Sequence, residues 1–468
     1  MNTYQRKIIT ALLIATFLSA IEVTIVSTAM PVIVDRLGGL ELISWVFAVY
    51  LLTSAVSTPI FGKLADLFGR KVIFMTGVTL FLIGSILCGL SQSMEQLIVY
   101  RAIQGVGAGA LMPVTFTIIG DVFSFEQRAK VQGLISSMWG IAGIFGPLVG
   151  GFFVDYMSWH WIFFINIPFG VISMFLISKY FKEQGQNRDR KIDYGGAFTF
   201  TIGTTALLFA LLTGGTDIPW NSASMYALFA ISVMFLSLFV RIQLKHPEPM
   251  LPIGLLRIRD LAVSNLSSFL VSGILIGLTA YLPLWIQGVL QMGATSSGLT
   301  LTPMSIGWPI GAMLCGRWMV RMGSRPLSLI GMFLITLGSI ALTMISQSTP
   351  NWFLIVVMFV MGLGFGLSMT VFMVIVQSSV EWNMRGVATS TNTFLRVLGQ
   401  TLGIAVLGTF LNQHIGEFTE SGSPVPPEIL ANGLHNVFLI LALLAIAGFI
   451  TTFWIPSQQA ELNQKKVS

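Results

Sequence analysis

A single carboxylate lies deep inside the first apolar stretch of the chain. Glu22 falls within LSAIEVTIVSTAMP (18–31), part of a run long enough to cross a bilayer as a helix. A charge at that depth costs at least about 2.5–3.5 kcal/mol, so acidic residues there are usually functional. A carboxyl group kept out of water also favours its protonated form. The position therefore suits a proton carrier, and a neutral acid that hydrogen-bonds a neighbouring helix is the structural alternative.

The composition indicates the kind of protein that must position this group. Of 468 residues, 54% are hydrophobic and only 9% are charged, whereas soluble domains carry about 25% charge. Apolar runs of about 20 residues recur along the chain, and the alternating strands of a membrane barrel are absent. We expect an all-α integral membrane protein. Cys88 and Cys315 both lie in apolar runs, so we expect no disulfide framework and no metal site.

The apolar runs predict fourteen membrane spans, which would place both termini on one side. Arg6 and Lys7 precede the first run, which continues too far to be a cleavable signal, so we interpret it as a retained span. The expected spans are 8–30, 44–64, 72–91, 96–120, 130–153, 161–181, 193–213, 222–241, 261–287, 297–317, 327–346, 352–379, 387–411 and 434–456.

The basic residues predict the orientation. If the N-terminus is cytoplasmic, only Arg36 of the 25 Lys and Arg residues falls on the outer side, and only Arg101 and Arg396 lie within spans. The net charge of +6 then reports membrane topology, which argues against a nucleic-acid partner. We expect a multi-pass protein of a bacterial cell membrane with both termini in the cytoplasm.

Three motifs recur at nearly constant offsets of 257, 254 and 253 residues. The pairs are QGVGAG (104–109) with MGLGFG (361–366), GKLADLFGRK (62–71) with GRWMVRMGSR (316–325), and FGPLVGG (145–151) with LGQTLGI (398–404). They predict two pseudo-symmetric six-helix bundles, 8–181 and 261–456, separated by an insert, 182–260, that holds two spans. Parallel repeats of this kind form a known transporter plan with substrate bound near the midplane.

Together with their order, the motifs resemble the major facilitator superfamily, and within it the fourteen-helix drug:proton antiporters. The resemblance rests on EVTIVSTAMP (22–31), SWVFAVYLLTSAVSTPIFGKLAD (44–66), GKLADLFGRK (62–71), RAIQGVGAGA (101–110), GIAGIFGPLVGG (140–151) and WHWIFFINIPFG (159–170). It implies a carrier that works by alternating access as a monomer, without a cofactor. Its partners would be drug-like small molecules, protons and the lipid bilayer.

The resemblance also implies a cytoplasmic gate. Arg70 could pair with Asp66 and Asp121, and Asp66 could face the positive end of a helix that starts near Gly386. Arg128 lies on the same side and is assigned to the gate. The alternative is that these charges only mark topology and a tight turn. In the second repeat Val320 occupies the position of Asp66, so that copy would lack the gate contact.

The glycine-rich fifth span would carry the antiporter motif of the family. Gly146 and Pro147 belong to it, and Pro147 removes a helix hydrogen bond and tends to kink the span. The motif favours export over uptake. Ala142 stands where the family usually has Gly, and plain helix packing is the alternative for each glycine.

The proton-coupling residues predicted with the help of the resemblance are Glu22, Arg101 and Asp155. Arg101 lies in a span that packs beside the first span in this superfamily, so we predict that Glu22 and Arg101 are coupled directly or through Gln104 and water. Asp155 closes the fifth span on the outer side and could merely be interfacial, and WHW (159–161) reads as an interfacial aromatic belt. The candidate substrate-binding residues are Trp45, Gln104, Gln287, Trp308, Asn392 and Phe394, with lipid or helix contact as the alternative for most of them.

Three rival functions share parts of this pattern. A proton-coupled exporter of one natural antibiotic, lipid or metabolite would carry every motif. An uptake symporter is disfavoured by the proline in the fifth span. A membrane enzyme or receptor is disfavoured because no Walker loop, zinc spacing, nucleophile constellation or sizeable soluble domain occurs. Segment 412–433 is expected to be a long external loop, either a plain surface loop or a cap.

Overall fold

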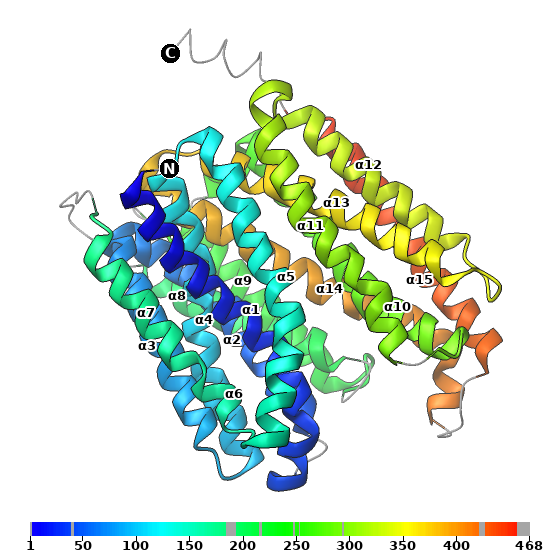
Figure 1. Cartoon of the computed structure of the whole chain (residues 1–468). Coiled ribbons are helices and arrows are strands. Elements are labelled where there is room, and N and C mark those ends of the chain that lie inside the picture. Colours follow the sequence, from blue (N-terminus) through cyan, green and yellow to red (C-terminus); the bar gives the residue numbers. More distant parts are fainter. Residues whose placement is uncertain are drawn as a thin grey trace. The chain divides into compact units, whose positions relative to one another are not determined.

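The computed structural model describes residues 2–38, 42–183, 193–214, 218–246, 249–251, 253–292, 294–420 and 426–455. Within these ranges the chain is helical, as the apolar runs predict, and no strand occurs beyond one isolated bridge between Gly214 and Ile218 (Figure 1). The helices are α1 (Thr3–Leu37), α2 (Ile43–Phe68), α3 (Arg70–Gly89), α4 (Met94–Val122), α5 (Phe125–Tyr156), α6 (Trp161–Phe164), α7 (Asn166–Tyr180), α8 (Tyr194–Thr213), α9 (Ala223–Lys245), η2 (Ile253–Arg257), α10 (Arg259–Leu284), η3 (Trp285–Val289), α11 (Ala294–Met322), α12 (Ser324–Thr343), α13 (Asn351–Ser378), η4 (Trp382–Met384), α14 (Arg385–Glu420) and α15 (Pro427–Thr452).

In the described part of the chain, twelve helical segments are long and apolar enough to cross a membrane. Helices α5 and α11 are comparable in length, with 32 and 29 residues, but fall outside this set. Helix α11 carries Thr, Ser and two Pro residues that lower its hydropathy, and α5 includes side chains outside the described ones. The expected number of fourteen spans therefore stays a prediction.

The chain divides into two compact units. The first comprises Met1–Ala210, Ala223–Leu255 and Val380–Phe394, and the second comprises Leu211–Ser222, Leu256–Ser379 and Leu395–Ser468. Helices α8 and α9 thus belong almost entirely to the first unit, together with the first turns of α14. The predicted three-part division, with a separate insert at 182–260, stays a prediction.

The recurring glycines pack helices in the same way in both units. A Cβ atom at Gly105 would lie 2.5 Å from the Tyr50 carbonyl oxygen of α2, and one at Gly362 would lie 2.4 Å from the Met304 carbonyl oxygen of α11. Only glycine therefore permits these approaches of α4 to α2 and of α13 to α11. Two other close approaches recur with the same offsets. Gly107 lies beside Gly77 in the first unit, as Gly364 lies beside Gly331 in the second. Gly109 lies beside Ser54, as Gly366 lies beside Trp308.

Two helix boundaries differ from the sequence-based expectations. The sixth predicted span is divided at Ile165 into α6 and α7, because Pro168 has no N–H to bond the Phe164 carbonyl. The expectation of a loop over 412–433 is wrong for most of this range, since α14 continues to Glu420 and α15 begins at Pro427; residues 421–425 lie outside the described ones. Proline at the start of α15 lacks an N–H that would have no helical partner there, so this proline begins a helix rather than marking a loop.

Candidate functional site

A polar cluster occupies the apolar interior of the first unit. Glu22 of α1 is fully buried, and so are Ser85 of α3, Arg101 and Gln104 of α4, and Asn166 of α7. Apolar side chains of α1, α4, α6 and the start of α2 form one hydrophobic core cluster in the same unit, including Ile21, Ile25, Leu97, Ile162 and Phe163. Four helices thus bring polar groups to one buried point.

Glu22 accepts two hydrogen bonds at this point. Nη1 of Arg101 lies 2.5 Å from Oε1 of Glu22, and Nδ2 of Asn166 lies 2.7 Å from Oε2. A direct Glu22–Arg101 contact, one of the two arrangements predicted from the sequence, is present. Its role in proton coupling stays a prediction.

Arg101 is held by partners besides the carboxylate. Nη1 also donates to Oε1 of Gln104 at 2.8 Å, and Nε donates to the Val46 carbonyl at 3.2 Å. The guanidinium lies 4.1 Å from the centre of the Tyr50 ring, within the range of a cation–π contact. Because Arg101 and Gln104 are three residues apart on α4, both side chains reach the same face of the helix.

Asn166 and Ser85 are members of the cluster that sequence reasoning missed. Nδ2 of Asn166 also donates to Oγ of Ser85 at 2.9 Å, and Ser85 donates to the Phe163 carbonyl at 2.9 Å. The only sequence signal was one amide in the otherwise apolar run WIFFINIPFG (161–170). The break between α6 and α7 places Asn166 at the first position of α7, where its side chain meets Glu22.

This arrangement can hold a proton or a charge. An ionised Glu22 is neutralised by Arg101, while a protonated Glu22 would leave Arg101 with the Gln104 and Val46 oxygens as acceptors. The ionised form accepts from both donors, whereas the O–H of a protonated Glu22 would need an acceptor in place of one of them. Among the described residues, no group of three or more His, Cys, Asp or Glu side chains could bind a metal ion.

A second charged cluster joins α2, α3, α4 and the start of α14. Oδ1 of Asp66 accepts from Nη2 of Arg70 at 2.7 Å, and its carboxylate also accepts from the backbone N–H groups of Gly386 at 3.1 Å and Val387 at 2.8 Å. Asp66 thus caps the N-terminus of α14, where a negative charge is favoured. Nε of Arg70 lies 3.1 Å from Oδ2 of Asp121. The predicted contacts of Asp66 and Arg70 are present, and their gate role stays a prediction.

Arg70 makes two further contacts, both with Trp382, one to its ring and one to its backbone carbonyl. Its guanidinium lies 3.9 Å from the centre of the Trp382 ring and donates to the Trp382 carbonyl at 2.8 Å. Gly62 and Gly386 allow α2 and α14 to approach, since a Cβ atom on Gly386 would lie 2.5 Å from the Gly62 carbonyl oxygen. We name Asp66, Arg70, Asp121, Trp382 and Arg385 the latch cluster.

Arg128 and Arg385 both bind the end of α4. Arg128 donates to the carbonyl oxygens of Gly120 at 2.7 Å and Phe123 at 3.1 Å. Arg385 donates to the Gly120 carbonyl at 2.7 Å and to Oδ1 of Asp121 at 3.1 Å. Sequence reasoning treated Arg385 only as a marker of topology. The repeat could have found it, because Arg385 follows Arg128 by 257 residues.

The antiporter-motif glycine packs α5 against α1. A Cβ atom on Gly146 would lie 2.0 Å from Oγ1 of Thr24, and this hydroxyl donates to the Ala142 carbonyl at 3.1 Å. A small residue is therefore required at Gly146. The side chains of Pro147 and Asp155 lie outside those that the structure describes.

The predicted substrate-binding residues are distributed over both units. Trp45 and Phe394 each contact a phenylalanine of α8, with ring centres 5.2 Å apart for Trp45–Phe209 and for Phe394–Phe200. Asn392 is buried in the first unit, and Gln104 belongs to the Glu22 cluster. In the second unit, Trp308 stacks on Phe365 at 5.5 Å and Gln287 is exposed. Substrate contact by Trp45, Gln104, Gln287, Trp308, Asn392 and Phe394 stays a prediction.

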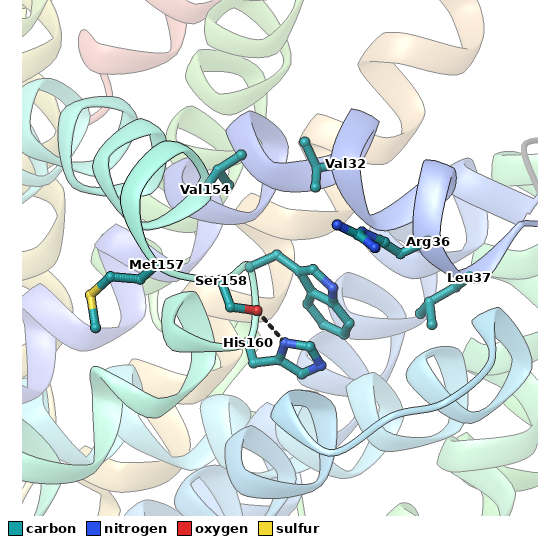
Figure 2. Close-up of a pocket in the computed structure, with 8 residues that line it drawn as sticks. Val32, Arg36, Leu37, Val154, Met157, Ser158 and His160 are labelled. Atoms are coloured by element: carbon teal, nitrogen blue, oxygen red, sulfur yellow. Dashed lines mark hydrogen bonds between the residues drawn. The ribbon is translucent and has the colours of Figure 1, made fainter.

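A pocket of about 370 Å³ lies at the ends of α1 and α5 (Figure 2). Oγ of Ser158 and Nδ1 of His160 are 2.6 Å apart, and the rings of Trp159 and His160 stack at 3.9 Å. Partial burial lowers the pKa of His160 below its ordinary value, which favours the neutral ring. Arg36 brings a guanidinium to this pocket. The lining residues are Val32, Arg36, Leu37, Val154, Met157, Ser158, Trp159 and His160.

Comparisons with known proteins point to one family. A family model described as "Major Facilitator Superfamily" matches residues 12–404. The chain is 40% identical over 402 residues to "Multidrug resistance protein 3" of Bacillus subtilis (strain 168), covering 86% of this chain and 78% of that protein. It is 38% identical over 409 residues to "Multidrug transporter protein MdtP" of the same strain, covering 87% and 76%. The solved structure of the human organic anion transporter MFSD10 (TETRAN) matches its fold with a TM-score of 0.69 at 14% identity, over 97% of this chain and 100% of the other.

Proposed function

Because the chain belongs to the Major Facilitator Superfamily, we propose that it exports hydrophobic and amphipathic compounds from the cell in exchange for protons. Relatives with at least 38% identity are named for multidrug resistance or transport, which supports this range of substrates. The observation that carries the proton part is the fully buried Glu22–Arg101 pair.

Glu22 would couple the movement of protons to the movement of substrate. Its protonated form carries the proton, and its ionised form favours binding of the substrate. Binding of substrate and binding of a proton then oppose each other, and each must weaken the other by the same factor. The ionised pair is satisfied by Arg101 and Asn166, and the protonated acid leaves Arg101 with two oxygen acceptors. Differential affinity of two conformations for the proton would drive alternating access. Asp155, whose side chain is not described, is the second candidate for proton transfer.

The latch cluster would hold one of these conformations. Asp66 receives two backbone hydrogen bonds from the first turn of α14 and one from Arg70. These contacts would have to break in each transport cycle, so they bias the equilibrium between conformations. Arg128, Gly146 and Pro147 are proposed to support the same movement, through the end of α4 and the packing of α5.

We propose that α5 and α11 cross the membrane together with the twelve apolar segments, giving fourteen spans as in drug:proton antiporters. Helix length supports this number, because 32 and 29 helical residues exceed the thickness of a bilayer. With both termini cytoplasmic, the chain would act as a monomer in a bacterial cell membrane. Residues 8–181 and 261–456 would form the two bundles, joined by 182–260.

The test uses proteoliposomes with an imposed pH gradient and a pH-sensitive dye inside. Norfloxacin, ethidium and tetraphenylphosphonium are added in turn to the wild type, to Glu22→Gln and to Asp260→Asn. Asp260 lies in the first turn of α10 and serves as the matched carboxylate control. We expect the compounds to discharge the gradient through the wild type and Asp260→Asn, and not through Glu22→Gln.

Two other outcomes would change the proposal. If Glu22→Gln equals the wild type, Glu22 is not the coupling group and coupling must reside at Asp66, Asp121 or Asp155. If no compound of the panel moves through the wild type, the alternative is preferred, namely a proton-coupled exporter of one natural antibiotic, lipid or metabolite.

A further inference from the structure

The side-chain amide of Asn166 uses its nitrogen but not its oxygen. Asn166 is the first residue of α7 and is fully buried. Its Nδ2 atom donates to Oε2 of Glu22 at 2.7 Å and to Oγ of Ser85 at 2.9 Å. Among the residues that the structure describes, none donates a hydrogen bond to its Oδ1 atom. A buried carbonyl oxygen without a donor is costly, so its position beside the proposed proton carrier requires an explanation.

Gln104, the other amide of this cluster, is held at both ends. Its Oε1 atom accepts from Nη1 of Arg101 at 2.8 Å, and its Nε2 atom donates to Oγ of Ser85 at 3.3 Å. Exchanging the two atoms by rotation would set an N–H group against a guanidinium, which can only donate. Rotation of Asn166 breaks no contact of its oxygen. Of these two amides, that of Asn166 is the one that can turn.

A change of charge on Glu22 reverses what its neighbour must do. The ionised carboxylate accepts from Nδ2 of Asn166, whereas a carboxyl O–H donates and needs an oxygen. A half-turn of the Asn166 amide about its last side-chain bond exchanges Oδ1 with Nδ2 and so offers that oxygen. In either orientation one amide atom bonds Glu22 and the other has no described partner. The two orientations are therefore closely balanced, and the charge of Glu22 selects between them.

We propose that the Asn166 amide is a switch for proton exchange at Glu22: it donates to the ionised carboxylate and, after a half-turn, accepts from the protonated one. A proton arriving from the aqueous phase forms the O–H bond of Glu22 and cancels its charge, and no covalent bond of the protein breaks. The Ser85 hydroxyl fits both orientations, since it can accept from Nδ2 or donate to Oδ1. This inference rests on the proposed export function and adds Asn166 to its coupling residues.

Infrared difference spectroscopy of the purified protein tests the switch without any transported compound. The protein is produced with asparagine that carries a heavy carbon isotope at its side-chain carbonyl, and spectra are recorded in detergent along a pH titration. The variants are Glu22→Gln, Asn166→Leu and Asn265→Leu, of which the last removes another buried asparagine, on α10 of the second unit. Drug-driven proton movement in proteoliposomes is measured for the same variants and for Asn166→Gln.

We expect protonation of Glu22 to shift the labelled amide carbonyl band to lower frequency, because Oδ1 of Asn166 gains a hydrogen bond from the carboxyl O–H. The carboxyl band and the amide shift should appear together along the titration, and both should be absent from Glu22→Gln and retained in Asn265→Leu.

The two substitutions of Asn166 should differ in their effects. Asn166→Leu should keep the Glu22 carboxyl band without the amide shift. It should slow drug-driven proton movement at least about tenfold, the effect of losing a hydrogen bond to a charged group. Asn166→Gln keeps an amide and should be intermediate. If Asn166→Leu does not fold, the wild-type spectra compared with those of Glu22→Gln still decide the point.

A labelled amide band that stays unchanged while the Glu22 carboxyl band appears would overturn the switch and leave Asn166 as a fixed donor. Proton movement in Asn166→Leu equal to that of the wild type would contradict it as well. A failure of the proposed function looks different. In that case Glu22→Gln removes no carboxyl band at any pH, so that Glu22 carries no proton and the switch fails with it.

Discussion

The two sequence repeats pack their helices alike but differ in buried charge. Gly107 and Gly364 make equivalent contacts in the two units. At the positions of Arg101 and Gln104, the second unit has Met358 and Met361, 257 residues later, and both are fully buried. The backbone packing of the fold is therefore independent of the ionisable site, which occupies the first unit alone among the described residues.

The two turns between paired helices show the same difference. Gly69 and Gly323 both adopt positive φ, at 99° and 83°, so each turn needs glycine. Asp66, Arg70 and Asp121 of the first copy correspond to Val320, Ser324 and Ser378 of the second. Turn geometry is thus common to both repeats, and the latch cluster exists in one of them. The variants below exchange or remove the features that distinguish the two copies.

The largest effect is expected when Arg101 is replaced by the residue of the second repeat. Arg101→Met leaves Glu22 as a buried charge without its cation, which should lower the free energy of unfolding by about 3–5 kcal/mol. Denaturant titration in detergent micelles measures this loss of unfolding free energy. The double variant Glu22→Met with Arg101→Met should recover most of the loss. A single variant as stable as the double would show that the pair is not a buried ion pair.

Alanine at the shared glycines should affect both repeats alike. Gly107→Ala and Gly364→Ala each force a methyl group against backbone atoms of the next helix, at 2.3 Å from the Phe81 nitrogen and 2.7 Å from the Gly331 oxygen. Overpacking of this kind costs about 1–3 kcal/mol. Melting temperatures check the prediction, with Gly143→Ala as a control because no atom lies within 4 Å of its added Cβ. A loss in only one repeat contradicts equivalent packing.

Stability should depend on the charge at Asp66 in the latch cluster and not on a charge at Val320, the matching position of the second repeat. Asp66→Asn removes the charge that caps α14, with an expected loss of about 1–2 kcal/mol. Val320→Asp at the matching, half-exposed position should stay within about 0.5 kcal/mol. Chemical denaturation of both variants tests this contrast. Equal effects would mean that Asp66 contributes no more than a surface charge.

The smallest expected effect concerns the ring beside Arg70. Trp382→Leu removes the cation–π contact and should cost about 0.5–1 kcal/mol. Trp352→Leu is the control, since Trp352 is 64% exposed at the start of α13. The two melting curves are compared directly, and identical shifts would leave no specific role for the ring.

The sequence predicted the charged contacts of the site better than the neutral ones. A carboxylate inside an apolar run requires a partner, and only Arg101 and Arg396 are basic residues predicted to lie within spans. The resemblance, which places the span of Arg101 beside the first span, then selected Arg101. The same reasoning, joined to the resemblance, indicated Asp66, Arg70, Asp121 and the start of α14. Asn166 and Ser85 were missed because a neutral polar group at depth is cheap enough to occur for packing alone.

Helix existence was predictable, whereas helix ends were not. Apolar length determines where a segment can span a membrane, and the predicted spans coincide with helices. Beyond the apolar part, α14 continues to Glu420 through polar residues, and hydropathy carries no information about that extension. Likewise, which side chains of α8 would meet Trp45 and Phe394 depends on tertiary packing that no local pattern encodes.

The most direct test of a single proton site in the first unit is substrate-induced proton release. Purified wild type, Glu22→Gln and Asp260→Asn are placed in weak buffer with a pH indicator, and tetraphenylphosphonium is added. The account predicts release of about one proton per bound compound from the wild type and Asp260→Asn, and none from Glu22→Gln. Undiminished release from Glu22→Gln, with binding intact, would contradict the assignment of Glu22 as the coupling carboxylate.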